Sequence, residues 1–216
     1  MDVKIKICGL TTKEALTAVA KLRVNFAGFS FIKDSPCNIL PDVAAEIASD
    51  LPPFVQKVAV VFKPTKDLLE DIFATFKPHY LQFDDDISPT DLARIKEIYH
   101  TRAIKSICIK TREDAENSIK TYGNTADMML FDGINNSNIH GNQPDRTFDW
   151  SILKNLKCPN PWILSGGLNR FNAQQAIRTS HAHIINASDS LEEVPGLKSV
   201  HMIEDFVKTS RIPSYL

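Results

Sequence analysis

Two hydrophobic patterns alternate along the chain. Short runs of apolar residues are typical of buried strands, and longer segments with apolar residues every three or four positions are typical of helices. The predicted strands cover residues 4–8, 26–32, 58–62, 80–83, 103–109, 128–132, 162–165 and 184–186. The predicted helices cover residues 12–22, 41–47, 68–76, 88–98, 111–122, 150–156, 169–177 and 200–207. Thr11 and Glu14 have the spacing of a capping box, which predicts that the first helix begins there.

This alternation predicts an α/β protein with a parallel sheet that is buried on both faces. Eight strand–helix units close most naturally into a (β/α)8 TIM barrel, and 216 residues are enough for one such domain over residues 1–216. An open, doubly wound sheet is the structural alternative. The sequence contains neither a linker nor the Gly-x-Gly-x-x-Gly motif that would favour it.

Composition narrows the class of protein and its partners. The chain is 43% hydrophobic and 24% charged, with a formal net charge of −1, and it has no basic, arginine-rich segment. We therefore expect no nucleic-acid partner. The sequence shows no apolar signal region and no apolar stretch of membrane-spanning length, so we expect a cytoplasmic protein without a membrane partner.

Cysteine and histidine spacing gives no support for a metal site. The four cysteines are widely separated and never form a Cys-x-x-Cys pair, so we expect reduced thiols rather than disulfides or zinc ligands. His181 and His183 are the only close pair of histidines, and a surface or packing role is the simpler interpretation for both. We expect no metal.

Residues at the carboxyl ends of the strands are the candidates for chemistry, because the active sites of (β/α)8 barrels lie there. These residues are Cys8, Gln82, Asp132, Gly166, Gly167 and Ser188. Strand alternation places Cys8 on the same face as Lys6, and Asp132 on the same face as Met128 and Leu130. A thiol and a carboxyl could therefore face each other across the mouth of the barrel.

Each candidate also has a purely structural interpretation. Cys8 is either a small buried hydrophobic residue or, beside an ammonium such as that of Lys6, a thiolate that serves as a base. Asp132 is either a loop or capping carboxylate or a proton donor. Gly166 and Gly167 form either an ordinary turn or a loop whose backbone N–H groups can approach a phosphate.

Motifs spread over the whole chain resemble those of the phosphoribosylanthranilate isomerases of tryptophan biosynthesis. They are Lys6-Ile7-Cys8-Gly9-Leu10-Thr11, Asp34-Ser35-Pro36, Pro52-Pro53-Phe54-Val55, Phe148-Asp149-Trp150, Leu164-Ser165-Gly166-Gly167-Leu168, and Glu192 with Pro195-Gly196. The resemblance implies an Amadori rearrangement of a small phosphorylated substrate, with Cys8 as general base and Asp132 as general acid. It implies no metal or organic cofactor, and it is compatible with a monomer or a homodimer.

The same resemblance implies which residues bind the substrate and its phosphate. They are Lys6, Gln82, Gly141, Gly166, Gly167, Ser188 and Ser190.

The sequence departs from the family pattern where substrate is expected to bind. Cys37 replaces an arginine, Asp84-Asp85 replaces His-Gly, Pro144 ends a loop that is usually glycine-rich, and Asp189 stands in the Ser-Ser-Gly that normally surrounds the phosphate. A carboxylate about 5 Å from a phosphate costs about 3 kcal/mol per charge pair at an effective dielectric constant near 20. Two hypotheses therefore stay open: a divergent isomerase, and a related barrel that has lost this activity and either serves as a binding or interaction protein or acts on a less anionic ligand.

Overall fold

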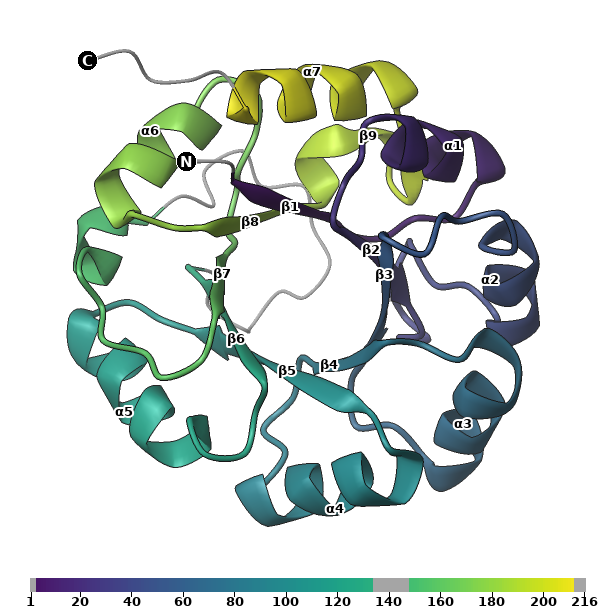
Figure 1. Ribbon diagram of the computed structural model, residues 1–216, viewed down its shortest axis with the longest axis horizontal. Helices are drawn as coiled ribbons and strands as arrows, with labels where there is room; N and C mark the ends of the chain where they lie inside the picture. The colour runs from purple at the N-terminus through teal and green to yellow at the C-terminus, as the bar shows by residue number, and fades with distance from the viewer. Residues whose placement is uncertain (1–2, 134–147, 212–216) are drawn as a thin grey trace.

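The computed structural model describes residues 3–133 and 148–211, and these residues form a closed barrel of parallel strands (Figure 1). The strands are β1 (Lys4–Ile7), β2 (Phe26–Ser30), β3 (Gln56–Val61), β4 (Tyr80–Phe83), β5 (Arg102–Cys108), β6 (Met128–Asp132), β7 (Trp162–Leu164) and β8 (Ile184–Ala187). Each strand pairs with the next in chain order, and β1 also pairs in parallel with β8. The closed barrel is confirmed, and the open sheet is wrong.

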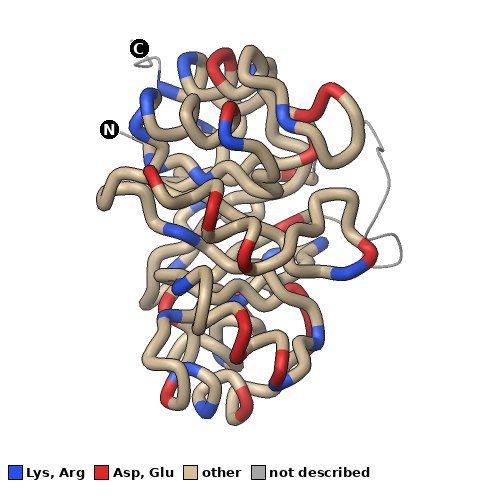
Figure 2. Tube along the Cα trace, turned by 90° about the vertical axis from the view of Figure 1, so that its right-hand side faces the viewer, with Lys and Arg blue, Asp and Glu red and all other residues tan. Residues whose placement is uncertain are grey.

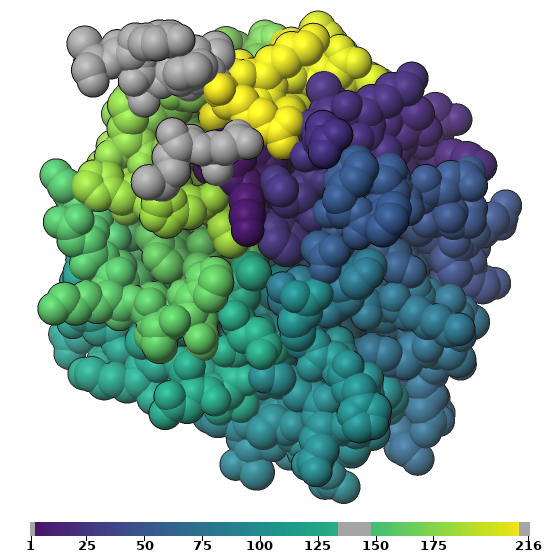
Figure 3. All heavy atoms as spheres, viewed as in Figure 1, coloured from purple at the N-terminus to yellow at the C-terminus, as the bar shows by residue number. Residues whose placement is uncertain are grey.

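Helices surround the barrel in chain order (Figure 1). The α-helices are α1 (Lys13–Lys21), α2 (Pro41–Ile47), α3 (Lys66–Asp71), α4 (Pro89–Tyr99), α5 (Arg112–Tyr122), α6 (Ala173–Ser180) and α7 (Val200–Ser210). A π-helical turn, η1 (Ile72–Phe76), extends α3, and 3-10 turns form η2 (Trp150–Leu153) and η3 (Asp189–Leu191). The first and last helices of the ring, α1 and α7, lie side by side (Figure 3).

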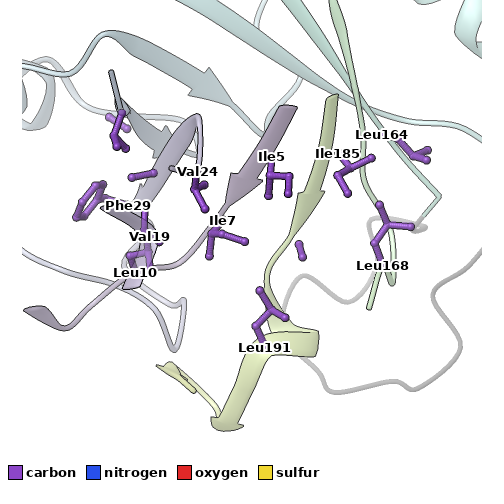
Figure 4. Close-up of a cluster of buried hydrophobic side chains, with 14 of the residues drawn as sticks. Ile5, Ile7, Leu10, Val19, Val24, Phe29, Leu164, Leu168, Ile185 and Leu191 are labelled. Carbon is purple, nitrogen blue, oxygen red and sulfur yellow. The ribbon is translucent and has the colours of Figure 1, made fainter. Parts of the chain in front are cut away.

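Strand alternation separates two hydrophobic layers. Side chains such as those of Ile5, Ile7 and Ile185 belong to the layer between strands and helices (Figure 4). A smaller cluster fills the barrel itself, and its buried members are Phe26, Val58, Val60, Tyr80, Ile104, Met128, Leu130, Ile163 and Ile184. Cys8 packs against this inner cluster, as the alternation predicts.

Several helices differ from the predicted ones, and the predicted helix over residues 150–156 is only the four-residue 3-10 turn η2. The starts of α1 and α6 differ for local reasons. Thr12, not Thr11, caps α1, since its hydroxyl accepts from the Ala15 N–H, whereas the Thr11 hydroxyl donates to the Gly196 carbonyl. The predicted capping box at Thr11 is therefore wrong: the N-cap lies one residue later, and Ala15 at the third helical position has no side chain that could complete the box. Helix α6 begins at Ala173 rather than at 169, because the Asn169 and Asn172 side chains bond the preceding loop backbone. Such local bonds compete with helix formation.

A short hairpin that the sequence analysis did not predict follows the barrel. It pairs β9 (Glu192–Val194) with β10 (Leu197–Lys198) in antiparallel fashion. Gly196 turns the hairpin at φ +87°, and a Cβ atom there would lie 2.2 Å from the Pro36 carbonyl oxygen. The hairpin is thus pressed against the loop between β2 and α2.

Charged residues of both signs are interspersed over the side of the molecule that Figure 2 shows. None of the helices in the described part of the chain has the length and apolar character that a membrane crossing requires. The single-domain organisation over residues 1–216 stays a prediction, although every described strand except β9 and β10 belongs to the one barrel.

Candidate active site

A cavity of about 950 Å³ opens at the carboxyl ends of the barrel strands. Cys8 and Asp132 both line it, which places the thiol from the end of β1 and the carboxyl from the end of β6 at one site. Of the other predicted site residues, Gln82, Gly166, Gly167, Ser188 and Ser190 line the same cavity. Gly141 and Pro144 lie outside the described residues.

Room for Cys8 is made by a glycine on the neighbouring strand. A Cβ atom at Gly28 of β2 would lie 2.8 Å from the Cys8 Sγ and 3.2 Å from the Lys6 Nζ. The thiol and the ammonium therefore lie close to the same point. Lys6 itself does not line the cavity, because its side chain is completely buried inside the barrel. A direct contact of Lys6 with substrate, which the sequence predicts, is not favoured by this position.

Asp132 is held from one side by polar residues inside the barrel. The Ser165 hydroxyl lies 2.8 Å from Asp132 Oδ2, and Asn186 Nδ2 lies 3.1 Å from the same hydroxyl. Lys6 Nζ in turn lies 3.0 Å from Asn186 Oδ1. The first strand of the barrel is thus connected to the sixth through side chains of β8 and of the residue after β7.

One end of the cavity carries the features that the sequence associates with phosphate. Gly166 and Gly167 adopt φ angles of +98° and +62°, which a side chain would disfavour. The Ser188 hydroxyl donates to the Cys8 carbonyl at 3.3 Å, and the exposed Ser190 donates to the Leu168 carbonyl. Asp189 lines the cavity beside them.

The opposite end of the cavity is formed by the ends of β4 and β5. Gln82 Nε2 donates to Asp84 Oδ1 at 2.9 Å, while the buried Gln82 Oε1 has no hydrogen-bond partner among the described residues. Burial raises the pKa of the Asp84 carboxyl, even though Gln82, Lys6, Ser106 and Lys105 act to lower it. Burial also lowers the pKa of the Lys105 ammonium.

Cys37, at the position of the family arginine, is not part of the cavity lining. It is buried against the hairpin, with its Sγ 3.1 Å from Glu192 Oε1 and 3.4 Å from Lys198 Nζ. Burial raises the pKa of the Cys37 thiol to about 12. Burial acts to raise the pKa of Glu192 as well, but the hydrogen bond and charge of Lys198 outweigh it, so this pKa is lowered. Cys37 therefore belongs to the packing of the hairpin.

Choosing candidates at the carboxyl ends of the predicted strands identified Cys8 and Asp132 as cavity residues. It missed Ser165, Asn186 and Lys105, which line the same cavity. Ser165 follows β7 directly and Asn186 lies within β8, so their positions near strand ends were the available signal. Within residues 3–133 and 148–211, no group of three or more histidine, cysteine, aspartate or glutamate side chains is arranged to hold a metal ion.

Comparisons with known proteins agree with this geometry. The family model described as N-(5'-phosphoribosyl)anthranilate (PRA) isomerase matches residues 5–209. The isomerase of Parvibaculum lavamentivorans is 33% identical over 98% of this chain and 99% of its own length, and that of Rhizobium etli CIAT 652 is 37% identical over 95% and 93%.

Solved structures of the same enzyme superimpose closely. The isomerase from Thermotoga maritima gives a TM-score of 0.84 at 27% identity, and the match covers 96% of this chain and 98% of that one. An isomerase in complex with reduced 1-(o-carboxyphenylamino)-1-deoxyribulose 5-phosphate gives 0.80 at 26% identity, over the same shares of each chain. The chain therefore belongs to the N-(5'-phosphoribosyl)anthranilate isomerase family.

Proposed function

We propose that Cys8 and Asp132 carry out the isomerisation that this family performs in tryptophan biosynthesis, from phosphoribosylanthranilate to carboxyphenylamino-deoxyribulose phosphate. The observation that carries this proposal is that the thiol and the carboxyl, contributed by β1 and β6, line one cavity. General acid–base catalysis needs both groups within reach of one bound substrate.

The reaction needs one proton donated and one removed. Asp132 donates a proton to the ribose ring oxygen as the C1–O bond breaks, which opens the ring to a Schiff base. Cys8, as the thiolate, then removes the proton from C2, and the electron pair of that C–H bond gives the enolamine. Tautomerisation of the enolamine yields the ketone. The Lys6 ammonium lies near the Cys8 thiol, inside the barrel.

The two ends of the cavity suit the two ends of such a substrate. We place the phosphate against Gly166, Gly167, Ser188 and Ser190, and the aromatic end against Gln82 and Asp84. Glycines with positive φ allow backbone N–H groups to approach a phosphate closely. We further propose a cytoplasmic monomer or homodimer without a nucleic-acid or membrane partner, and the isomerase of Thermotoga maritima is described as dimeric.

The test is the consumption of freshly generated phosphoribosylanthranilate, followed by its fluorescence. We expect turnover by the wild type and a loss of about 10²- to 10⁴-fold in kcat for Cys8→Ala and for Asp132→Asn, the usual contribution of an acid or base. Cys158→Ala, which removes a half-buried thiol away from the cavity, is the matched control and should keep full activity.

Two outcomes would count against the proposal. Full activity of either active-site variant would remove that residue from its role. A wild type that neither binds inorganic phosphate nor shows turnover at saturating substrate would instead support the second hypothesis, a related barrel that acts as a binding protein or on a less anionic ligand.

A further inference from the structure

The side chains of Lys6, Asn186, Ser165 and Asp132 form a hydrogen-bonded chain whose direction is set at one end. The Lys6 ammonium has three N–H donors and no acceptor. Its Nζ lies 3.0 Å from a side-chain atom of Asn186, so that atom must be the oxygen, Oδ1. Lys6 therefore determines the orientation of the Asn186 amide, with Oδ1 toward Lys6 and Nδ2 away from it.

The rest of the chain follows from this orientation. Asn186 presents its NH₂ group, which can only donate, to the Ser165 Oγ at 3.1 Å. Since this bond occupies a lone pair of the Ser165 oxygen, the Ser165 hydroxyl hydrogen is directed to Asp132 Oδ2 at 2.8 Å. Lys6 only donates, Asn186 and Ser165 each accept from one neighbour and donate to the next, and Asp132 Oδ2 is the final acceptor.

The barrel holds these groups rigidly. Lys6 is 0% exposed, Ser165 4% and Asn186 7%, so water has little access to these three side chains. Lys6 and Asn186 are direct partners in the β1–β8 register, and β7 and β6 are the next strands around the barrel. Hydrogen bonds between buried side chains restrict the geometry of the groups that they join.

We infer that Ser165 and Asn186 are positioning residues that act on catalysis through Asp132. They hold Asp132 Oδ2 as an acceptor, so the proton that Asp132 transfers is carried by Oδ1. This inference rests on the proposed function, which makes Asp132 the acid. The Ser165 hydrogen bond strengthens when Asp132 becomes a carboxylate, so it stabilises the transition state more than the bound substrate.

The first test is Ser165→Ala, with Ser210→Ala as its matched control. Ser210 is also buried, and its hydroxyl donates to the Phe206 carbonyl within α7, away from the cavity. Losing a hydrogen bond to a charged group lowers kcat by about 10- to 100-fold, and we expect this for Ser165→Ala with little change in KM. Ser210→Ala should keep the wild-type kcat.

The pH profile separates this role from a merely structural one. A hydrogen bond to the carboxylate favours the ionised form, so its removal makes Asp132 hold its proton to higher pH. The acid must be protonated to act. The alkaline limb of the kcat profile should therefore move to higher pH in Ser165→Ala and stay in place in Ser210→Ala.

The second test reverses the direction of the hydrogen bond between Asn186 and Ser165. In Asn186→Asp the new carboxylate accepts from both Lys6 and Ser165, so the Ser165 hydroxyl turns away from Asp132. We expect a loss of kcat similar to that of Ser165→Ala. The double variant should be about as active as the slower single variant, because both substitutions remove the same bond to Asp132.

Inorganic phosphate binding, measured on the same preparations, shows that each variant retains a folded cavity. The inference is wrong if kcat of Ser165→Ala stays within about twofold of that of Ser210→Ala. It is also wrong if the losses of the two single variants multiply in the double variant. An active wild type with an inactive Asp132→Asn would leave the proposed function intact in either case.

Discussion

At the scale of single residues, Asp189 is the departure from the family pattern with the clearest electrostatic consequence. It lines the cavity at the end where we place the phosphate. Replacing its carboxylate with an amide removes a repulsion of up to about 3 kcal/mol at about 5 Å, so Asp189→Asn should lower the Kd for inorganic phosphate by up to about a hundredfold. Isothermal titration at low salt measures this, and the gain should shrink as salt is added.

The matched control removes the same charge from the other end of the cavity. Asp86 also lines the cavity, next to the end of β4, and Asp86→Asn should change phosphate affinity much less. Equal changes of Kd in the two variants would mean that phosphate affinity depends on the overall charge of the cavity. An unchanged Kd in Asp189→Asn would mean that this carboxylate points away from the phosphate.

Single residues also show what the sequence could and could not predict. Cys8 and Asp132 were predictable, because each ends a strand and strand alternation assigns its face. Ser165 and Asn186 end two predicted strands as well, but their hydrogen bonds could not be predicted, since these run between β8 and its neighbours and depend on the register of the closed barrel. The sequence identified Cys37 only as a departure from the family pattern. Its contact with Glu192 could not be predicted, because it depends on where the hairpin lies.

At the scale of elements, regular segments were predicted better than their connections. Every strand of the barrel was predicted, because buried parallel strands appear as continuous apolar runs. The hairpin β9–β10 was missed, because it is largely exposed and its strands have only three and two residues. Its position depends on Gly196 against Pro36, a contact between segments far apart in sequence, and its two strands are joined by the buried pair of Glu192 and Lys198.

That buried pair makes the hairpin sensitive to substitution and to pH. The Lys198 side chain is 0% exposed and that of Glu192 6%, so Glu192→Gln leaves a buried ammonium without its carboxylate. Breaking such a pair costs about 3–5 kcal/mol of unfolding free energy. Urea unfolding at pH 7 should show this loss, whereas Glu193→Gln, an exposed neighbour in the same hairpin, should stay within about 0.5 kcal/mol of wild type.

The pH dependence follows from the direction of the Glu192 pKa, which is lowered in the folded protein. A lowered carboxyl pKa contributes stability that is fully present above the ordinary value of 4.5 and is lost as the pH falls through the folded value. The difference between wild type and Glu192→Gln should therefore narrow in acid. A difference that is constant from pH 7 into acid would show that the charge of Glu192 does not stabilise the hairpin.

At the scale of the whole molecule, the fold depends on joining the two ends of the chain. The barrel is closed by the β1–β8 ladder, and the ring of helices is closed by α1 against α7 (Figure 1). The same closure builds the site, because it brings Lys6 and Cys8 of the first strand segment next to Asn186 and Ser188 of the last. The geometry of the candidate site therefore depends on the closure of the barrel.

Arg211 provides a direct test of how the outer ring is closed. From the end of α7 its guanidinium donates to the Leu22 and Arg23 carbonyls, which follow α1. Arg211→Ala removes both bonds, and we expect a loss of about 2 kcal/mol in unfolding free energy. Lys208→Ala, which removes an exposed cation from the same helix, should cost less than about 0.5 kcal/mol.

The shape of the urea transition then shows whether the two closures are independent. Because the β1–β8 ladder is untouched by Arg211→Ala, the barrel should still unfold as one unit, with a lower midpoint and an unchanged m-value. A reduced m-value or a second transition would mean that α7 separates from α1 before the barrel opens. In that case the Arg211 contacts would be required for cooperative unfolding of the whole molecule, and the strand ladder alone would not be sufficient.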